Sequence, residues 1–313
     1  MDVFTTRKGN KIYTLDHHFQ GITSAIASYL IPHSMGGILV ETGPGSTTDR
    51  LVKELNNCGY DPSDINDVFL THIHLDHAGA AGWFASMGAN IYVHHIGAPH
   101  LKNPEKLLSS AARLYGDKMN ELWGEFIPVP HNKIIELEDG TEISINGLQI
   151  KALDTPGHAS HHHAYLFEDV LFSGDIGGIR MRDLKHIRLP MPPPEFNLEL
   201  WKNSAAKLLD ENRNGSFSSI APTHFGLFTD ADWHMFAINS ALDEIDTWMN
   251  ETMPAGYDLK VLNERFLDWT EKRSLKEGLT LEQIQPYEAA NPSWMSTYGI
   301  SRYWRKKRQH LIE

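Results

Sequence analysis

Four side chains of the kinds that bind metal ions lie within residues 72–77 (HIHLDH) of this chain. An apolar run precedes this segment and a run of small residues follows it, which predicts a buried strand, a loop and then a helix. Residues two apart in an extended chain point the same way, so His72 and His74 can bind one cation together. Asp76 and His77 follow the bend and can face a second cation nearby.

Three more candidate ligands occur later in the chain, each in a similar setting. His158, Asp175 and His224 each follow an apolar β-like run and stand beside or near glycine or proline. Strand ends hold a side chain rigidly, and the turn residues allow backbone and substrate to approach closely. The seven side chains together exceed the needs of a single tetrahedral ion.

Composition restricts the class of protein. The chain has 313 residues, 41% hydrophobic and 22% charged, which is ordinary for a soluble globular protein. No apolar run reaches the roughly 18 residues of a membrane span, and the polar N-terminus does not resemble a secretion signal. Cys58 is the only cysteine, so no intramolecular disulfide can form, and we expect a cytoplasmic protein.

The charge balance indicates which partners to expect. The net charge of −12 argues against nucleic acid, which needs many cationic contacts, and favours a small-molecule substrate. Residues 302–308 (RYWRKKR) form a basic run near the C-terminus, which we interpret as a solvated helix end, with a docking patch as the alternative. A homodimer through the helical segments is a further expectation.

Strand-like and helix-like segments alternate over the first two thirds of the chain. Strands are expected at residues 11–15, 24–31, 37–41, 68–71, 91–94, 133–137, 141–145, 148–153, 164–167, 170–173 and 219–221. Helices are expected at residues 47–57, 78–87, 103–123, 198–212, 231–251, 258–277 and 281–287. We therefore predict a catalytic domain at residues 1–229, with a helical insertion at about 100–130, and a C-terminal helical subdomain at 230–313.

The motifs resemble those of the metallo-β-lactamase superfamily, and most closely its glyoxalase-II-like hydrolases. The resemblance covers roughly residues 20–228 and rests on four motifs in order: Thr71-His72-x-His74-x-Asp76-His77, Thr155-Pro156-Gly157-His158, Gly174-Asp175 and Pro222-Thr223-His224. It implies an α+β fold, a four-layer αβ/βα sandwich of two mixed sheets with helices outside, here with a C-terminal helical extension.

The resemblance also implies a role for each ligand. A first metal would be bound by His72, His74 and His158, and a second by Asp76, His77 and His224, with Asp175 bridging both. Two divalent ions are expected, with Zn²⁺ as the default, while iron and manganese suit the same ligands. A hydroxide bridging the ions would attack the carbonyl of an ester, thioester or lactone, and Asp76 would also orient its proton.

The chain departs from the family pattern near two of these motifs. Glu41 stands where relatives usually carry aspartate after the third strand, and it is a candidate to orient a ligand histidine. His161 replaces a glycine of the usual Gly-His-x-x-Gly-His pattern, and His162 matches its second histidine. We predict His162 as a catalytic-site residue that supports the metal loop or the site wall, with plain packing as the alternative.

Other predictions concern the cleft. The stiff run at residues 190–194 (PMPPP) either frames the substrate cleft or forms a plain surface loop. Arg180, Arg182 and Arg188 either meet an anionic substrate group or pair with the acidic surface. The tryptophans of the C-terminal third are expected mainly in the core, with a subset available to line the cleft.

Two other activities are compatible with the sequence. A phosphodiesterase could use the same dinuclear centre, although the sequence shows no large cationic groove. A persulfide dioxygenase would keep a similar first motif and use one iron. Metal analysis and oxygen consumption separate the second from a hydrolase.

Overall fold

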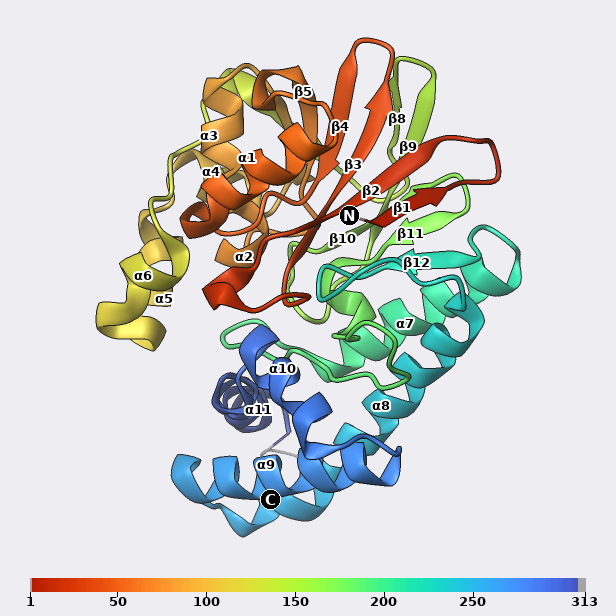
Figure 1. Cartoon of the computed structure of the whole chain (residues 1–313). Coiled ribbons are helices and arrows are strands. Elements are labelled where there is room, and N and C mark those ends of the chain that lie inside the picture. Colours follow the sequence, from red (N-terminus) through yellow and green to blue (C-terminus); the bar gives the residue numbers. More distant parts are fainter. Residues whose placement is uncertain (1, 309–313) are drawn as a thin grey trace.

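The computed structural model describes residues 2–308, which form two facing β-sheets with helices on the outside (Figure 1). A seven-stranded sheet has the strand order β1-β2-β3-β4-β5-β6-β7, and a five-stranded sheet has the order β12-β11-β10-β9-β8. The strands are β1 (Asp2–Thr5), β2 (Lys11–Asp16), β3 (Ala27–His33), β4 (Gly36–Val40), β5 (Ile65–Phe69), β6 (Asn90–His94), β7 (Ile134–Leu137), β8 (Glu142–Ile145), β9 (Leu148–Asp154), β10 (His163–Phe167), β11 (Val170–Phe172) and β12 (Ser219–Ala221). Both sheets are mixed: β4 to β7 pair in parallel, as do β11 and β12, and the other neighbours are antiparallel.

The helices fall into three groups along the chain. Those of the first half are α1 (Thr48–Asn57), α2 (Leu75–Ala78), α3 (Ala81–Ser86), α4 (Ala98–Lys102), α5 (Glu105–Tyr115) and α6 (Met119–Trp123). The long helix α7 (Leu198–Arg213) precedes β12. The C-terminal group comprises α8 (Ala231–Thr252), α9 (Leu259–Lys276), α10 (Leu281–Ala290) and α11 (Ser293–Lys307).

The space between the sheets is filled by large side chains that alternate along the strands. Tyr29 and Phe69 from the larger sheet meet Tyr165 and Phe172 from the smaller one, and all four are at most 1% exposed. Phe69 contacts the edge of the Tyr165 ring, with centroids 5.2 Å apart. Residues that alternate along a strand reach opposite faces, so each sheet has a second face that the helices cover.

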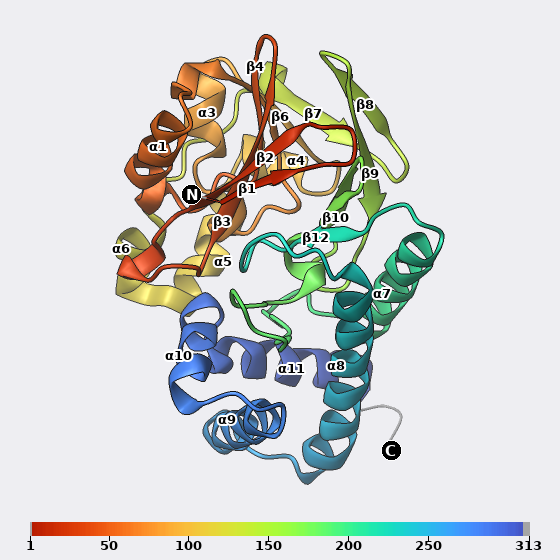
Figure 2. The same ribbon diagram turned by 45° about the vertical axis from the view of Figure 1, so that its right-hand side comes forward.

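The outer faces of the sheets are covered by amphipathic helices. Leu51 and Leu55, four residues apart on α1, pack with α3 against the larger sheet. Trp201 and Leu208 of α7 pack with α8 against the smaller sheet. These layers confirm the predicted α+β four-layer sandwich, and its C-terminal helices extend it on one side (Figure 2).

Several elements differ from the sequence-based expectations. β1, α4 and α11 are not among the expected elements, and the predicted helix at 103–123 is divided into α5 and α6. The predicted helix at 78–87 is broken into α2 and α3. The break lies at Gly79, where a Cβ atom would come within 2.6 Å of the Gly45 backbone nitrogen. This close approach lets the metal-binding segment pack directly on the loop that follows β4.

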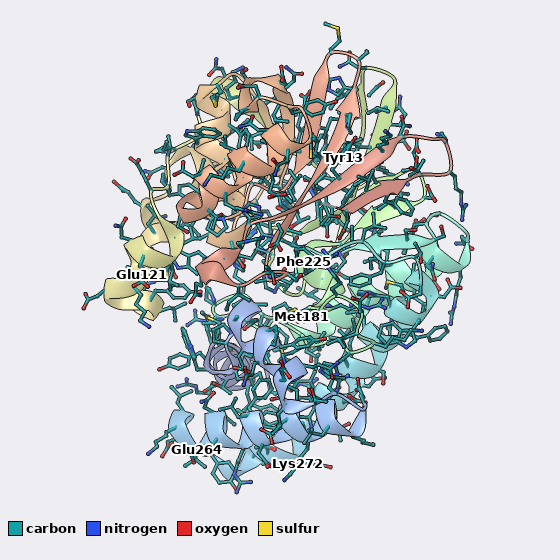
Figure 3. The ribbon with its side chains drawn as sticks, in the orientation of Figure 1. Tyr13, Glu121, Met181, Phe225, Glu264 and Lys272 are labelled. Atoms are coloured by element: carbon teal, nitrogen blue, oxygen red, sulfur yellow. The ribbon has the colours of Figure 1, made fainter. Side chains whose placement is uncertain are left out.

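The C-terminal helices dock on the sandwich through apolar and ionic contacts. Met181, labelled in Figure 3, lies between the sheets and these helices and packs with Tyr287 of α10. Arg308, at the end of the basic run, pairs with Asp246 of α8 and Glu199 of α7, so that part of the run is anchored. None of the described helices is long and apolar enough to cross a membrane.

Acid should weaken this docking. Burial opposes ionisation of Asp246, but hydrogen bonds from Lys202 and Arg308 outweigh it and lower the pKa of the carboxyl below its ordinary value of 3.8. A lowered folded-state pKa means that the pair stabilises above about pH 4 and is lost as pH falls through that pKa. We expect Asp246→Asn to cost about 1 kcal/mol at pH 7 and to flatten the fall in the free energy of unfolding between roughly pH 5 and 3. Urea titrations at several pH values measure this, and an unchanged pH profile would contradict the assignment.

Candidate metal centre

The seven predicted ligands come together at one edge of the sandwich, where strands from both sheets end. His72 and His74 follow β5, and Asp76 and His77 lie on the short helix α2. The remaining ligands follow three strands of the smaller sheet: His158 after β9, Asp175 after β11 and His224 after β12. Strand ends give these side chains a rigid origin, as expected from the motifs.

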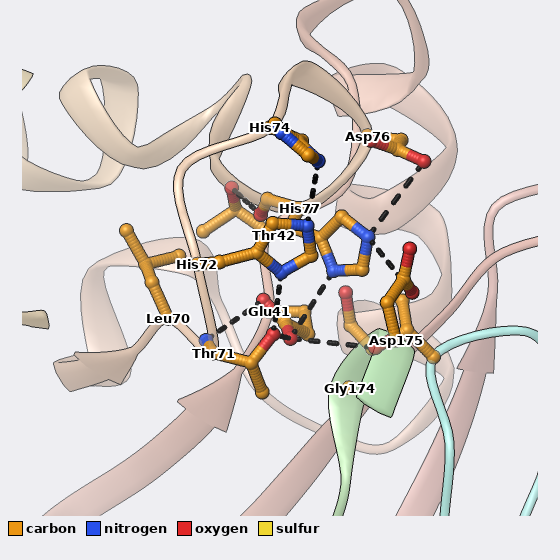
Figure 4. Close-up of polar contacts among 12 residues, drawn as sticks. Glu41, Thr42, Leu70, Thr71, His72, His74, Asp76, His77, Gly174 and Asp175 are labelled. Carbon is orange, nitrogen blue, oxygen red and sulfur yellow. Dashed lines mark hydrogen bonds and ion pairs between the residues drawn. The ribbon is translucent and has the colours of Figure 1, made fainter. Parts of the chain in front are cut away.

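His72, His74 and His158 form the first group. His74 Nδ1 lies 2.9 Å from His72 Nε2, a contact drawn in Figure 4. The same nitrogen lies 3.0 Å from His158 Nε2. These three atoms are mutually close enough to bind one ion. Three imidazole nitrogens that converge in this way match a three-histidine metal site with further positions open.

Asp76, His77 and His224 form the second group. His224 Nε2 lies 3.4 Å from Asp76 Oδ2, and His77 Nε2 lies 3.7 Å from the same oxygen. Their ligand atoms also converge on one point. One carboxylate and two imidazoles suit a divalent ion such as zinc.

Asp175 lies between the two groups. Its Oδ2 is 3.3 Å from His158 Nε2 of the first group, and its Oδ1 is 3.3 Å from His77 Nε2 and 3.5 Å from His224 Nε2 of the second. Each carboxylate oxygen therefore faces a different group. This is the geometry that a bridging ligand requires.

Hydrogen bonds fix which nitrogen of each ring faces the centre. His158 Nδ1 donates to the Pro190 carbonyl at 2.8 Å, and His224 Nδ1 donates to the Ala25 carbonyl at 2.7 Å. A neutral imidazole with its proton on Nδ1 keeps a lone pair on Nε2. In both rings that lone pair points at the other ligands, which is the tautomer that metal binding needs.

Burial and charge affect the two groups differently. Burial lowers the pKa of His74 to about 3 and holds that of His72 well below its ordinary value. Burial also opposes a charge on His77 and His224, but the Asp175 carboxylate and its neighbours outweigh it and raise both pKa values. The first group therefore offers neutral lone pairs, and the carboxylates beside the second group stabilise a positive charge there, which a bound cation can supply in place of a proton.

These observations fit divalent metal ions. Apart from their mutual contact at 3.3 Å, His77 Nε2 and Asp175 Oδ1 are buried without a hydrogen-bond partner among residues 2–308, although such atoms in proteins are nearly always paired. Buried, acceptor-rich groups of this kind are stabilised by coordinating a cation. The donor set, five imidazoles and two carboxylates, agrees with zinc and with other borderline ions.

Glu41 supports the second group from behind. Its carboxylate accepts a hydrogen bond from Thr71 Oγ1 and lies 3.3 Å from His77 Nδ1 (Figure 4). Glu41 is fully buried and has a φ of 66°, a left-handed conformation that is uncommon outside glycine. The Glu41 side chain is one methylene longer than that of aspartate, and its carboxylate reaches a position from which it can orient His77.

Removing the Glu41 carboxylate should weaken metal binding at the second group. We expect Glu41→Ala to lower affinity by about 10- to 100-fold, because His77 loses the acceptor that orients it. Glu41→Asp is the matched control, since it keeps a carboxylate on a side chain one methylene shorter. Competition with a chromophoric chelator measures the affinity, and equal affinity of all three proteins would refute this role for Glu41.

A separate histidine-aspartate cluster contrasts with these groups. His94, Asp154 and His163 also converge, with His94 Nε2 2.7 Å from Asp154 Oδ1. However, His94 Nδ1 accepts a hydrogen bond from the Ile96 backbone N–H, so in the neutral ring the proton lies on Nε2. That nitrogen donates to Asp154 and has no lone pair for a metal.

His162, predicted as a catalytic-site residue, is fully buried behind the first group. Its ring centroid lies 5.0 Å from that of His72, and its Nδ1 contacts Thr155 Oγ1 at 2.9 Å. It does not line the cavity above the ligands. The structure thus places it where it can support the ligands, and not in contact with substrate.

Two neighbours of the site were not assigned from the sequence. His161 Nε2 lies 3.0 Å from Glu195 Oε2, and both residues line the cavity beside His74. The replacement of glycine by His161 in the motif was the available signal. No sequence signal indicated Glu195, which follows the proline run.

The predictions for the cleft have mixed outcomes. A cavity of about 730 Å³ opens above the ligands, and the proline run at 190–194 lines it as one of the predicted alternatives. The arginines do not line it. Arg180 pairs with Asp230 at 2.7 Å, Arg188 pairs with Glu288, and Arg182 pairs with Asp2. The suggestion that they meet a substrate anion is therefore wrong, and the alternative of pairing with acidic residues holds.

The facing sheets and the clustered histidines and aspartates define a protein of the metallo-β-lactamase fold class. The chain belongs to the metallo-β-lactamase superfamily, whose sequence model matches residues 22–213. It is 28% identical over 147 residues to the metallo-beta-lactamase fold-containing protein ST1585 of Sulfurisphaera tokodaii, a match that covers 46% of this chain and 55% of that protein. It is 32% identical over 147 residues to a hydroxyacylglutathione hydrolase of Aeromonas hydrophila, covering 47% of this chain and 44% of that protein. The chain thus spans about half the length of these curated relatives.

A solved structure extends the likeness over nearly the whole chain. The metallo-beta-lactamase family protein TTHA1429 of Thermus thermophilus superposes with a TM-score of 0.62, covering 95% of this chain and 93% of that one. The identity is 21%, so this comparison supports the fold.

Proposed function

We propose that this chain hydrolyses the carbonyl of an ester, thioester or lactone of a small molecule, using two divalent ions with zinc as the default. The observation that carries this proposal is the pair of ligand groups that share Asp175, whose two oxygens face different groups. Together they lie at the base of a cavity open to a small substrate.

Divalent ions at such a centre polarise a carbonyl and lower the pKa of a water toward neutrality. The protein contributes position and charge. Three side chains of the ligand groups also line the cavity, namely His74, Asp76 and His224. A substrate in the cavity would therefore lie directly beside the ligands. The chain needs no serine or cysteine nucleophile for this chemistry.

Asp76 is the side chain best placed to orient the attacking water by accepting a hydrogen bond from it. Burial raises its pKa, but His77 and His224 outweigh that effect and lower it to about 2. Asp76 therefore stays a carboxylate at neutral pH and can accept a hydrogen bond. Its side chain is 20% exposed, on the cavity side of the ligands.

Chelation tests the proposal. Removing metal with dipicolinate is expected to abolish hydrolysis of a thioester and lactone panel, and adding back Zn²⁺, Mn²⁺ or Fe²⁺ separately should restore it and identify the ion. Activity that survives complete metal removal would overturn the proposal. Phosphodiester substrates and an oxygen electrode run beside the panel, so that a phosphodiesterase or an iron dioxygenase is recognised directly.

A further inference from the structure

The cavity above the ligands is bordered by two segments that lie outside the sandwich. One is the helical insertion α4 to α6, and the other is the junction between α10 and α11. Both flank the edge of the sandwich that holds the ligands (Figures 1 and 2). They meet at Tyr115 and Trp294, whose ring centroids are 6.1 Å apart. The substrate space is therefore shaped by segments of the chain that lie outside the ligand motifs.

The walls that these segments supply are mainly apolar and aromatic. Trp123 stacks on Phe19 with centroids 5.4 Å apart and contacts Tyr115 at 5.0 Å. Trp294 and Met295 continue the wall from the C-terminal side. A continuous apolar wall of this size favours a large apolar group, because burying each methylene contributes about 0.8 kcal/mol.

The insertion also brings three cations to the cavity. Lys106 and Arg113 lie seven residues apart on α5, which places them on the same face of the helix, and Lys118 follows in the next turn. All three are exposed, and no ion pair joins any of them to another residue within 2–308. On a chain with a net charge of −12, three unpaired cations beside one cavity favour an anionic ligand group.

We propose that the cavity selects esters or thioesters in which a large apolar acyl group is joined to an anionic leaving group. This inference rests on the proposed function and specifies its substrate class. The acyl group packs on the aromatic wall, and the cations of α5 and the following turn bind a carboxylate or phosphate of the leaving group. Each turnover consumes one water: its oxygen stays on the acyl carbon, the C–S or C–O bond breaks, and one of its protons goes to the leaving group.

Acyl chain length tests the wall. With acetyl, butanoyl and octanoyl thioesters of 3-mercaptopropionate, kcat/KM is expected to rise at least about tenfold from acetyl to octanoyl. Trp294→Ala should remove most of this gain and Trp294→Phe should keep most of it. Phe236→Ala, which removes a 58% exposed aromatic ring of α8 outside the cavity, should leave the gain unchanged. Octanoate should also inhibit the unaltered protein more strongly than acetate does, which tests the apolar wall without a variant.

Charge on the leaving group tests the cations. The octanoyl thioesters of N-acetylcysteamine, 3-mercaptopropionate and phosphopantetheine carry neutral, carboxylate and phosphate leaving groups. The triple variant Lys106→Ala, Arg113→Ala, Lys118→Ala is expected to raise KM about tenfold for the anionic substrates and to leave the neutral one unchanged. Whichever anion shows the larger change identifies the group that these cations bind.

A matched variant controls for net charge. Lys8→Ala, Lys53→Ala, Lys260→Ala removes the same charge from exposed positions that do not line the cavity and should leave KM unchanged. Faster hydrolysis of acetyl than octanoyl substrates, or equal effects of the two triple variants, would overturn this inference while leaving the proposed function intact. Failure to hydrolyse any carbonyl substrate, with metal bound, would overturn both.

Discussion

Asp175→Ala is expected to remove both metal ions and to lower kcat/KM by about 10³-fold or more, because the metals supply several kcal/mol of transition-state stabilisation. The two oxygens of this carboxylate face different groups, Oδ2 toward His158 of the first and Oδ1 toward His77 of the second. Without them, five histidines and Asp76 would hold two cations with one carboxylate fewer to offset their repulsion. Metal content after dialysis and thioester turnover measure the two effects together.

Asp154→Ala provides the control for this variant. Asp154 also contacts two histidines, His94 and His163, but the proton on His94 Nε2 leaves that cluster without a suitable lone pair. We expect this variant to keep its metal content and turnover. An Asp175→Ala protein that retains both ions and full activity would contradict the bridging assignment.

His74→Ala and His224→Ala should each remove one ion and leave the other. His74 contributes to the first group alone, and His224 to the second. Each variant is expected to lose about 10²- to 10⁴-fold in kcat/KM, since one ion can supply only part of the polarisation and water activation. Titration with Zn²⁺, followed by elemental analysis, should show one tight equivalent in each. Loss of both ions from both variants would mean that the two groups do not bind independently.

The strands were largely predictable because they carry strong local patterns, whereas their arrangement as a four-layer sandwich was implied by the family resemblance. The apolar runs before His72, His158, Asp175 and His224 end where the strands end, within a few residues. β1 was missed because it is an edge strand with mostly exposed residues and no alternation to detect. Its pairing with β2 is a tertiary contact that the local sequence does not encode.

The last helix was missed for a different reason. α11 contains Gly299, which lowers helix propensity, and its signal is weak in isolation. A Cβ atom at this position would lie 1.9 Å from the Met191 carbonyl oxygen, so glycine is required by the packing of α11 on the proline run. Long-range packing, which is invisible in the local pattern, thus decides the residue there.

The ligand set could be read from the motifs, but its surroundings could not. The sequence offered Glu41 only as a candidate to orient a histidine, whereas its contacts with Thr71 and His77 depend on a left-handed backbone. The pairing of His161 with Glu195 joins segments separated by more than 30 residues. Likewise, the cavity wall needs an insertion and a C-terminal helix to meet, and nothing local to either segment specifies that contact.

Elemental analysis of the purified chain, saturated with divalent metal and freed of excess by gel filtration, tests the central claim most directly. The two ligand groups and their shared carboxylate predict two equivalents of divalent ion per chain. Fewer than one equivalent, or a single ion that no further metal can supplement, would contradict a dinuclear centre.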